Sequence, residues 1–337
     1  MTSSPCLYTR TLDGHRGAYL KFLRAQIGGD RGSICEILTT QRPVMFLMIE
    51  DNFFLYVCTA LLRTILRRRT VGLLFRPGPT VSGTSLRLKI KSFALKAMRP
   101  LKSVQTLSIV PLDFLPEQAS LIDDWIHDFQ LWDIGETERA EVSAVQAGLA
   151  LGEAAALAAA MKQTSTSRPI LAALGVQSRG KGFSILTEAA RQQATAGWAV
   201  CVTGRVSEDQ KTAKARLGAT GALIEDRFAS DAEIWAIYAC ASAIWCLYDP
   251  SYDQASGILG RAVQFGVPVV VRDGSISHAL CQAEDLPHCA ASGPEDLAQA
   301  LASLPRADPA RGAALSEKLR NQNITKLLRA LGHGDVV

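Results

Sequence analysis

The chain has 337 residues, of which 48% are hydrophobic and 20% are charged, so intrinsic disorder is excluded and a substantial core is expected. This length exceeds what one hydrophobic core usually fills, which predicts two domains. The formal net charge of only +4 gives no indication of nucleic acid binding.

The cysteines and the first residues indicate a cellular compartment. Eight cysteines include no C-x-x-C pair and lie mostly in apolar runs, which favours buried free thiols in a reducing environment over disulfides. The opening "MTSSPCLYTR" lacks the basic and apolar regions of a signal peptide. The apolar run "FFLYVCTALL" is too short to span a bilayer. We therefore expect a cytoplasmic protein.

The front half alternates apolar runs with helical patterns. Strands are predicted at 5–9, 33–39, 44–50, 71–75 and 104–110, and helices at 14–29, 52–69 and 85–98. Alternating strands and helices predict a parallel sheet with helical crossovers. The Ala-rich segment 137–162 predicts one long helix. The polar segment "QTSTSRP" that follows is the best linker in the chain.

The back half repeats this alternation. Strands are predicted at 170–174, 198–204, 221–226, 243–248 and 268–273, and helices at 182–197, 207–218, 230–241 and 257–266. We therefore predict an α/β protein with domains at 1–165 and 166–337, each a doubly wound parallel sheet, and leave open whether the last helix crosses back. Ligands of such sheets bind beyond the carboxyl ends of the strands, and domain interfaces are favoured sites.

The loop after the predicted strand 170–174 contains two cations, Arg179 and Lys181, among three glycines. Cations beside the amides of a helix start favour a diphosphate. A solvated basic loop is the alternative. After the next strand, Gly204 would let a ligand approach the backbone beside Arg205, or it simply forms a turn.

The stretch "YDPSYDQASGILGRA" contains a second candidate anion site. Ser256, Gly257 and Ile258 begin a helix whose first amides could hold a phosphate. Asp253 precedes them and is interpreted as an acceptor for sugar or ribose hydroxyls, or as a helix cap.

In the front half, Gly14 and His15 lie between the first strand and the first helix. There His15 either contacts a ligand or is a surface residue. Arg76 follows a strand, where it could neutralise a phosphate or a leaving group, or lie on the surface. The segment 123–133 is either a functional loop or, as we prefer, a packed crossover. The basic segments "RTILRRRT" and "RLKIKSFALKAMRPLK" suit an anionic membrane or a half-packed helix face.

The back half, over roughly 168–275, resembles the retaining GT-B glycosyltransferases of the large family 4 type. Four segments match in order: "ALGVQSRGKGFSILTEAA", "WAVCVTG", "DAEIWAIYACASAIWCLYD" and "SGILGRAVQFGVPVVV". The resemblance implies a GT-B fold, with two Rossmann-like doubly wound domains facing a cleft. It also implies that a nucleotide-sugar binds the C-terminal domain.

The resemblance implies roles for particular residues. Arg179 and Lys181 match the pair that holds the donor diphosphate, and the helix start at 256–258 matches a loop that contacts donor phosphate. Gly14 and His15 fall near the loop that closes on the donor. Asp253 and Arg261 occupy the positions of two glutamates in the family, so one carboxylate is kept and the other is replaced by a cation, which cannot accept hydrogen bonds from ribose.

We therefore expect a hexosyltransferase that moves a hexose from a UDP- or GDP-linked donor to a surface-glycan or lipid-linked acceptor, with retention. This reaction belongs to exopolysaccharide or lipopolysaccharide biosynthesis and needs neither a metal nor a cofactor besides the donor. The expected location is the cytoplasm, with the cytoplasmic face of the membrane left open. The alternatives are a GT-B-shaped binding or regulatory protein that has lost catalysis and a nucleotide-sugar epimerase.

Overall fold

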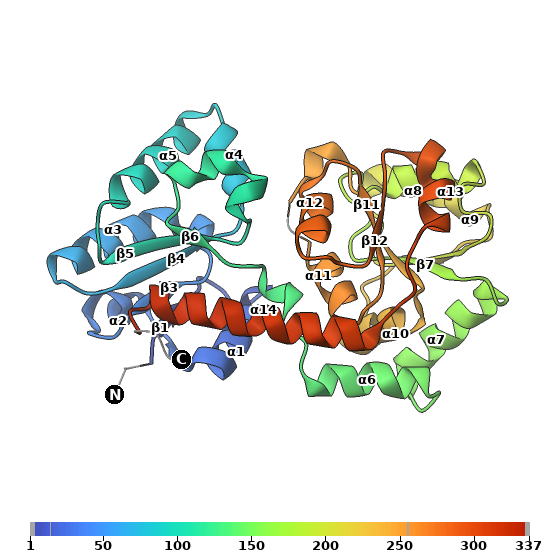
Figure 1. Cartoon of the computed structure of the whole chain (residues 1–337), viewed down its shortest axis with the longest axis horizontal. Helices are drawn as coiled ribbons and strands as arrows, with labels where there is room; N and C mark the ends of the chain where they lie inside the picture. Colours follow the sequence, from blue (N-terminus) through green and yellow to red (C-terminus); the bar gives the residue numbers. More distant parts are fainter. Residues whose placement is uncertain (1–3, 14, 255, 334–337) are drawn as a thin grey trace. The chain divides into compact units, whose positions relative to one another are not determined.

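The computed structural model describes residues 4–13, 15–254 and 256–333. The chain divides into two compact units: a first unit of residues 1–129 with 318–337, and a second unit of residues 130–317. Each unit is a sheet flanked by helices (Figure 1).

The first unit is built on a six-stranded parallel sheet in the order β2-β1-β3-β4-β5-β6. Its strands are β1 (Cys6–Tyr8), β2 (Asp30–Arg31), β3 (Val44–Phe46), β4 (Thr70–Leu74), β5 (Val104–Ser108) and β6 (Asp124–Trp125). Its helices are α1 (His15–Ile27), α2 (Ile34–Thr39), α3 (Phe53–Ile65), α4 (Pro77–Ser82), α5 (Leu86–Met98) and the end of α14 (Pro309–Ala330), with 3-10 turns η1 (Ile49–Asn52), η2 (Leu112–Phe114), η3 (Pro116–Ser120) and η4 (Phe129–Leu131), the last reaching into the second unit.

The second unit has its own six-stranded parallel sheet in the order β12-β11-β10-β7-β8-β9. Its strands are β7 (Ile170–Leu174), β8 (Ala199–Thr203), β9 (Leu223–Glu225), β10 (Ala243–Cys246), β11 (Val269–Arg272) and β12 (His288–Ala291). Its helices are α6 (Glu136–Gln146), α7 (Gly152–Ser165), α8 (Phe183–Arg191), α9 (Lys211–Gly218), α10 (Asp231–Cys240), α11 (Gly257–Gln264), α12 (Ile276–Ala283), α13 (Pro294–Ala302) and the start of α14, with 3-10 turns η5 (Glu208–Gln210) and η6 (Pro250–Tyr252).

The prediction of two doubly wound parallel sheets is confirmed, and two local predictions are wrong. Residues 33–39 form helix α2 rather than a strand, because Ser33 and Glu36 make a reciprocal capping box at its start. The helix predicted over 137–162 is divided into α6 and α7. Gly148 and Gly152 break it, since both adopt left-handed backbone conformations (φ +74° and +61°).

Helices α6 and α7 belong to the second unit, so the compact units divide at 129/130, whereas the sequence analysis placed the domain boundary at 165/166. The physical reason is packing onto α10. Val145, Ala154 and Ala158 form a small buried cluster with Ala236 of α10, and this cluster fixes both helices beside α10. The last helix, α14, begins in the second unit and ends in the first.

The cysteines of the chain are free thiols. Five are buried, namely Cys6, Cys201, Cys246, Cys281 and Cys289. Burial raises the pKa of Cys201 and Cys289 to about 12, so these thiols remain protonated and unreactive at neutral pH. In the described ranges, no helix is both long and apolar enough to cross a bilayer.

Arg63 of α3 is fully buried and joins several backbone segments of the first unit. Its guanidinium donates to the carbonyls of Ile37, Thr40, Arg42 and Arg69 at 2.6–3.2 Å, and to the Thr70 hydroxyl. Burial lowers its pKa to about 10. The side chain thus satisfies the carbonyl groups at the amino end of the sheet, where α2 and α3 finish.

We expect the Arg63→Met variant to lose about 3 kcal/mol or more of unfolding free energy, because a buried side chain that donates to four carbonyls is removed. The Thr40 and Arg69 carbonyls each keep a second donor, the Arg68 guanidinium and the Val44 amide. Urea denaturation followed by circular dichroism measures this loss. The matched control is Arg87→Met, at an exposed position of α5. A variant that unfolds at the wild-type urea concentration would contradict the structural role of Arg63.

Candidate functional site

Strand order reverses once in each sheet, and these reversals locate the candidate sites. In the second unit β7 lies between β8 and β10, so the chain leaves β7 in one direction and returns on its other side at β10. Such a switch point is where open α/β sheets bind ligands, beyond the carboxyl ends of the strands. We call the loop after β7 (175–182), the segment after β10 (247–254) and the helix cap Ser256 the switch-point region.

Lys181 is held in the switch-point region by aromatic rings. Its ammonium nitrogen lies 4.3 Å from the centroid of the Tyr248 ring and 4.7 Å from that of Tyr252. The two rings meet edge to face at 5.7 Å. Cation–π contacts of this kind keep a charge in place without neutralising it. Lys181 therefore remains a fixed positive charge beside the loop after β10.

Arg179 is exposed on the same loop, and the loop is tied to the segment after β10 by a backbone bond. The Asp249 amide donates to the Gly180 carbonyl at 3.0 Å. Hydrogen bonds from Ser251 lower the pKa of Asp249, and the charges of Arg179 and Arg272 lower it further. The predicted cations Arg179 and Lys181 thus lie together, with Arg272 as a third cation close by.

Ser256 begins helix α11 as predicted. Its hydroxyl accepts from the Leu259 amide and makes a 2.8 Å hydrogen bond with the Tyr248 hydroxyl. The amides of Gly257 and Ile258 stand in the first helical turn, where backbone donors have no intrahelical acceptor. One tyrosine, Tyr248, thus contacts both the Lys181 ammonium and the cap of this helix.

Gly257 is required by packing as well. A Cβ there would lie 1.5 Å from the side-chain oxygen of Gln130, in the segment that precedes α6. Ile258 also has a structural contact, since its carbonyl accepts from the Tyr238 hydroxyl at 3.1 Å. Whether Gly257 and Ile258 also contact a donor stays a prediction.

Gly204 directly follows β8 in a conformation that other residues rarely adopt, with φ of +145°. A Cβ at this position would lie 1.9 Å from the Gly175 carbonyl oxygen. The close approach of the segment after β7 therefore explains the glycine, and its predicted contact with a ligand stays a prediction. Arg205 is exposed, and its guanidinium lies 5.9 Å from the centroid of the Phe228 ring.

Asp253 makes two local contacts. One oxygen accepts from the guanidinium of Arg272 at 2.9 Å, and the other accepts from the Ile276 amide at the start of α12, also at 2.9 Å. The second contact is with the start of α12, whose N-cap is Ser275, and not with α11, the helix that Asp253 precedes. Its predicted role as an acceptor for sugar hydroxyls stays a prediction.

Arg261 forms an ion pair with Asp133 at 3.0 Å, and its guanidinium lies 5.5 Å from the centroid of the Trp235 ring. Both side chains of the ion pair are largely buried. Gln264, one turn later on α11, also donates to Asp133. The cation at this position therefore has a partner within the second unit, the carboxylate that precedes α6.

Of the residues predicted for the first unit, Arg76 follows the carboxyl end of β4. Gly14 lies outside the described residues, and His15 is described only as the first backbone position of α1. Arg76 is exposed at the start of α4. Their relation to the residues of the second unit, and the cleft predicted between the domains, stay predictions.

Glu50 supports the loop that contains Arg76. One of its oxygens accepts from the amides of Phe75 and Arg76 at 2.7 and 2.6 Å. The other oxygen is inaccessible to solvent, and within the described ranges it has no hydrogen-bond donor. Burial raises the pKa of this carboxyl. Glu50 thus fixes the backbone that follows β4, while burial of its charged carboxylate costs electrostatic free energy.

The switch point of the first sheet lies between β1 and β3, and a bidentate ion pair occupies it. Arg16 of α1 binds both carboxylate oxygens of Asp51, and Arg10 donates to the Asp51 carbonyl at 3.4 Å. The hydrogen bonding of Arg16 to the Asp51 carboxylate is the main cause of a raised pKa for Arg16. The pair ties the first helix to the loop after β3.

The segment 123–133 is a packed crossover, as preferred over a functional loop. Trp132 is fully buried, and His127 is 4% exposed. The His127 amide donates to the side chain of Asn323 on α14 at 2.8 Å. Among the residues with described placement, no group of three His, Cys, Asp or Glu side chains is arranged to hold a metal ion.

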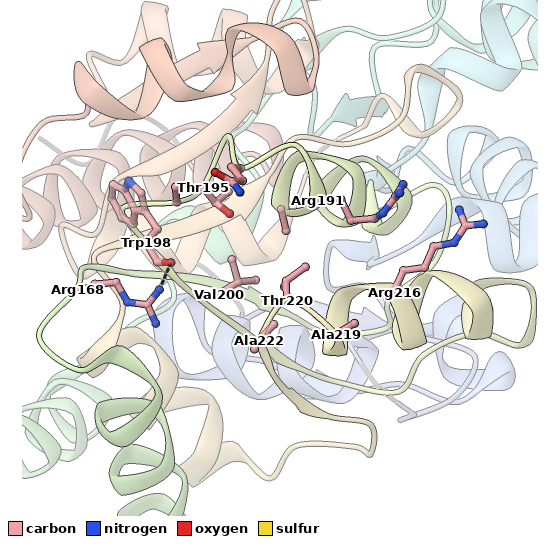
Figure 2. A pocket seen from close by; sticks show the side chains of 13 residues that line it. Arg168, Arg191, Thr195, Trp198, Val200, Arg216, Ala219, Thr220 and Ala222 are labelled. Carbon is pink, nitrogen blue, oxygen red and sulfur yellow. Dashed lines mark hydrogen bonds between the residues drawn. The ribbon is translucent and has the colours of Figure 1, made fainter.

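A pocket of about 530 Å³ lies at the opposite end of the second sheet (Figure 2). It is lined by residues that precede β8 and β9, among them Trp198 and Ala222. Figure 2 shows the Arg168 guanidinium bound to the Trp198 carbonyl, and this guanidinium also donates to the carbonyls of Ser165 and Thr164. None of the predicted site residues lines this pocket.

Several residues in and beside the switch-point region were missed by the sequence analysis. Tyr248 and Tyr252 hold Lys181, and Arg272 binds Asp253. The positions of these residues could have indicated them, because Tyr248 comes two residues after β10 and Arg272 is the last residue of β11. Polar and aromatic residues directly after adjacent strands of a parallel sheet share one edge.

Comparison with known proteins supports the fold. No protein-family model matches the chain, and no curated protein matches it in sequence. Among solved structures, HepE from Anabaena, in complex with UDP and glucose, is 11% identical with a TM-score of 0.57, covering 98% of each chain. WaaG, a glycosyltransferase involved in lipopolysaccharide biosynthesis, is 12% identical with a TM-score of 0.51 and 97% of each chain covered.

Alpha,alpha-trehalose 6-phosphate synthase from Burkholderia multivorans is 14% identical with a TM-score of 0.58, covering 94% of this chain and 75% of that chain. At such identities the likeness shows the fold alone. The fold is GT-B, as the sequence resemblance implied.

We expect Gly204→Ala to destabilise the protein by about 3 kcal/mol, because the added methyl meets a backbone carbonyl in a strained conformation. Chemical denaturation of the purified variant measures the effect. Gly197→Ala is the control, since a Cβ at Gly197 meets no atom within 4 Å. Equal stability of the two variants would contradict the close approach at Gly204.

We expect Glu50 to make stability depend on pH. A buried carboxyl with a raised pKa stabilises the fold below its ordinary pKa of 4.5 and loses this contribution as the pH rises through the folded value. The unfolding free energy of Glu50→Gln should therefore fall less than that of wild type across this window. Urea titrations at a series of pH values measure the difference, and parallel curves would rule out a raised pKa.

Proposed function

We propose that the chain is a glycosyltransferase that moves a sugar from a nucleotide-sugar donor to an acceptor. The observation that supports this most is the fixed ammonium of Lys181, with Arg179 on the same loop and the α11 amides beyond the shared tyrosine. Two cations and free amides at a switch point suit a diphosphate. The structural neighbour HepE was solved with UDP and glucose, which favours a UDP-linked donor.

In this proposal the second unit binds the donor. Arg179 and Lys181 stabilise the diphosphate as it leaves, and this positive charge is why we infer a reaction that needs no metal. Arg205 stands after the adjacent strand and is assigned to the same ligand. Gly204, Ser256, Gly257 and Ile258 shape the backbone around it.

The finer details are also proposals. We infer a hexose donor linked to UDP or GDP, retention at the anomeric carbon, and a surface-glycan or lipid-linked acceptor held by the first unit. The neighbour WaaG acts in lipopolysaccharide biosynthesis, which fits such an acceptor. Catalytic roles are assigned to Asp253, His15 and Arg76, with Gly14 in the donor loop.

A binding protein without catalysis is the second candidate. Two observations favour it: Asp253 is occupied by Arg272 and the Ile276 amide, and Arg261 is paired with Asp133. A carboxylate held in this way is a weaker acceptor for a substrate hydroxyl. Release of the nucleoside diphosphate from a nucleotide-sugar, with and without sugar acceptors, separates the two candidates, because only the transferase turns the donor over.

We expect nucleoside diphosphates to bind the wild-type protein and Lys181→Ala to weaken this binding about 10- to 100-fold, as expected for one lost charge-assisted contact. Isothermal titration with UDP, GDP and ADP measures the dissociation constants, and UDP is expected to bind best. The experiment gives the donor base as well as the role of the lysine.

The matched controls for this experiment lie in the same unit. Lys211→Ala removes an exposed lysine that pairs with Glu208. Arg179→Ala should weaken binding as Lys181→Ala does, and Arg216→Ala, at an exposed arginine of α9, is its control. Neither control should change the affinity. Absence of binding by the wild-type protein, or equal losses in Lys181→Ala and Lys211→Ala, would refute a donor site at the switch-point region.

A further inference from the structure

The first unit contains a long stretch without acidic residues. Between Asp51 and Asp113 the chain has eleven lysines and arginines and no aspartate or glutamate. This stretch includes helices α3, α4 and α5. The chain as a whole has 36 basic and 32 acidic residues, so the positive charge is concentrated here.

The outward side of α3 is apolar. Phe54, Leu61 and Ile65 are 63%, 47% and 79% exposed, and their spacing of seven and four residues places them on one side of the helix. The opposite side packs into the core through Tyr56 and Ala60. A solvent-facing side of this composition is unusual, because such positions are normally polar.

The outward side of α5 combines an apolar stripe with cations. Leu86, Ile90 and Phe93 follow helical spacing and are 75%, 45% and 74% exposed. Lys89 and Lys96 are exposed along one flank of this stripe. An apolar stripe bordered by lysines is the pattern of a helix that lies in the interface of an anionic bilayer.

The two helices lie on the same face of the first sheet. α3 connects β3 to β4, and the segment with α4 and α5 connects β4 to β5, so right-handed crossovers place them on one side. Both pack into one core cluster, α3 through Tyr56 and α5 through Leu95. The Lys91 ammonium of α5 also lies 5.4 Å from the centroid of the Phe53 ring of α3. In Figure 1 α5 lies above the strands of its own sheet.

We propose that this surface, which we call the α3–α5 face, binds the surface of an anionic lipid membrane. Its apolar residues would enter the boundary between headgroups and acyl chains, and its lysines and arginines would contact acidic headgroups. Because no helix within the described residues is long and apolar enough to cross a bilayer, the association is interfacial and reversible.

The composition of the face favours lipid over other partners. Lysine is depleted from the centres of protein–protein interfaces, yet here lysines alternate with the apolar residues along α5. Nucleic acid would be bound by the cations, but it offers nothing to aliphatic side chains such as Leu61, Ile65 and Leu86. A bilayer surface satisfies both kinds of residue together.

The test is co-sedimentation of the full chain with vesicles of phosphatidylcholine and phosphatidylglycerol, against vesicles of phosphatidylcholine alone. We expect binding to the anionic vesicles that weakens as salt is added. Lys89→Ala and Lys96→Ala should each lower the partition coefficient about fivefold. The double variant Leu86→Ser with Phe93→Ser should lower it at least about tenfold, because two side chains no longer enter the interface.

The control for the apolar residues is Leu149→Ser, whose side chain is 74% exposed in the second unit, like that of Leu86 in the first. It should bind vesicles as the wild type does. Failure of the wild-type protein to sediment with anionic vesicles at low salt would overturn the proposal, as would an equal loss in the Leu149 variant. Self-association that Leu86→Ser abolishes, without vesicle binding, would assign the face to a second copy of the chain.

Discussion

Strand β7 is the central element of the second unit, and the candidate site depends on its position. Its neighbours β8 and β10 lie on opposite sides, and the loops after β7 and β10 are joined by the bond between the Asp249 amide and the Gly180 carbonyl. Glycines make this junction tight: a Cβ at Gly182 would lie 2.0 Å from the Leu247 carbonyl oxygen. The backbone therefore fixes where Lys181 and the start of α11 stand.

Charge in and beside the switch-point region is positioned by aromatic rings and by a carboxylate. Tyr248 and Tyr252 keep the Lys181 ammonium in place and leave its charge available. Arg272, by contrast, is bound to Asp253. The charge of Lys181 therefore remains available to an anionic ligand, whereas the charge of Arg272 is balanced by Asp253. We assign roles to these cations on this basis.

The periodicity of the sequence was sufficient to predict both parallel sheets, because alternating apolar runs and helical segments determine this architecture. The position of Lys181 and Arg179 after a strand was predictable for the same reason. The strand predicted at 33–39 was wrong because apolar content outweighed the capping signal of Ser33 and Glu36. The break between α6 and α7 depends on two glycine conformations, which composition does not reveal.

Contacts between residues distant in sequence were beyond prediction. Arg261 and Asp133 are 128 positions apart, and nothing local to either residue indicates the pair. The same holds for Gly257, whose missing side chain makes room for Gln130. Such residues look functional in a sequence because their positions are unusual, and only packing shows that they also have structural partners.

The last helix has a consequence for the order in which the chain folds. Residues 318–337 belong to the first unit, where the Ala330 carbonyl accepts from Arg69 and Lys326 lies 3.8 Å from the centroid of the Trp125 ring. During synthesis the second unit is therefore complete before the first, although the first unit begins the chain. The first unit is complete only after the part of α14 beyond residue 317 has left the ribosome, so a chain that stops near residue 317 would have an unfinished first unit and a finished second unit.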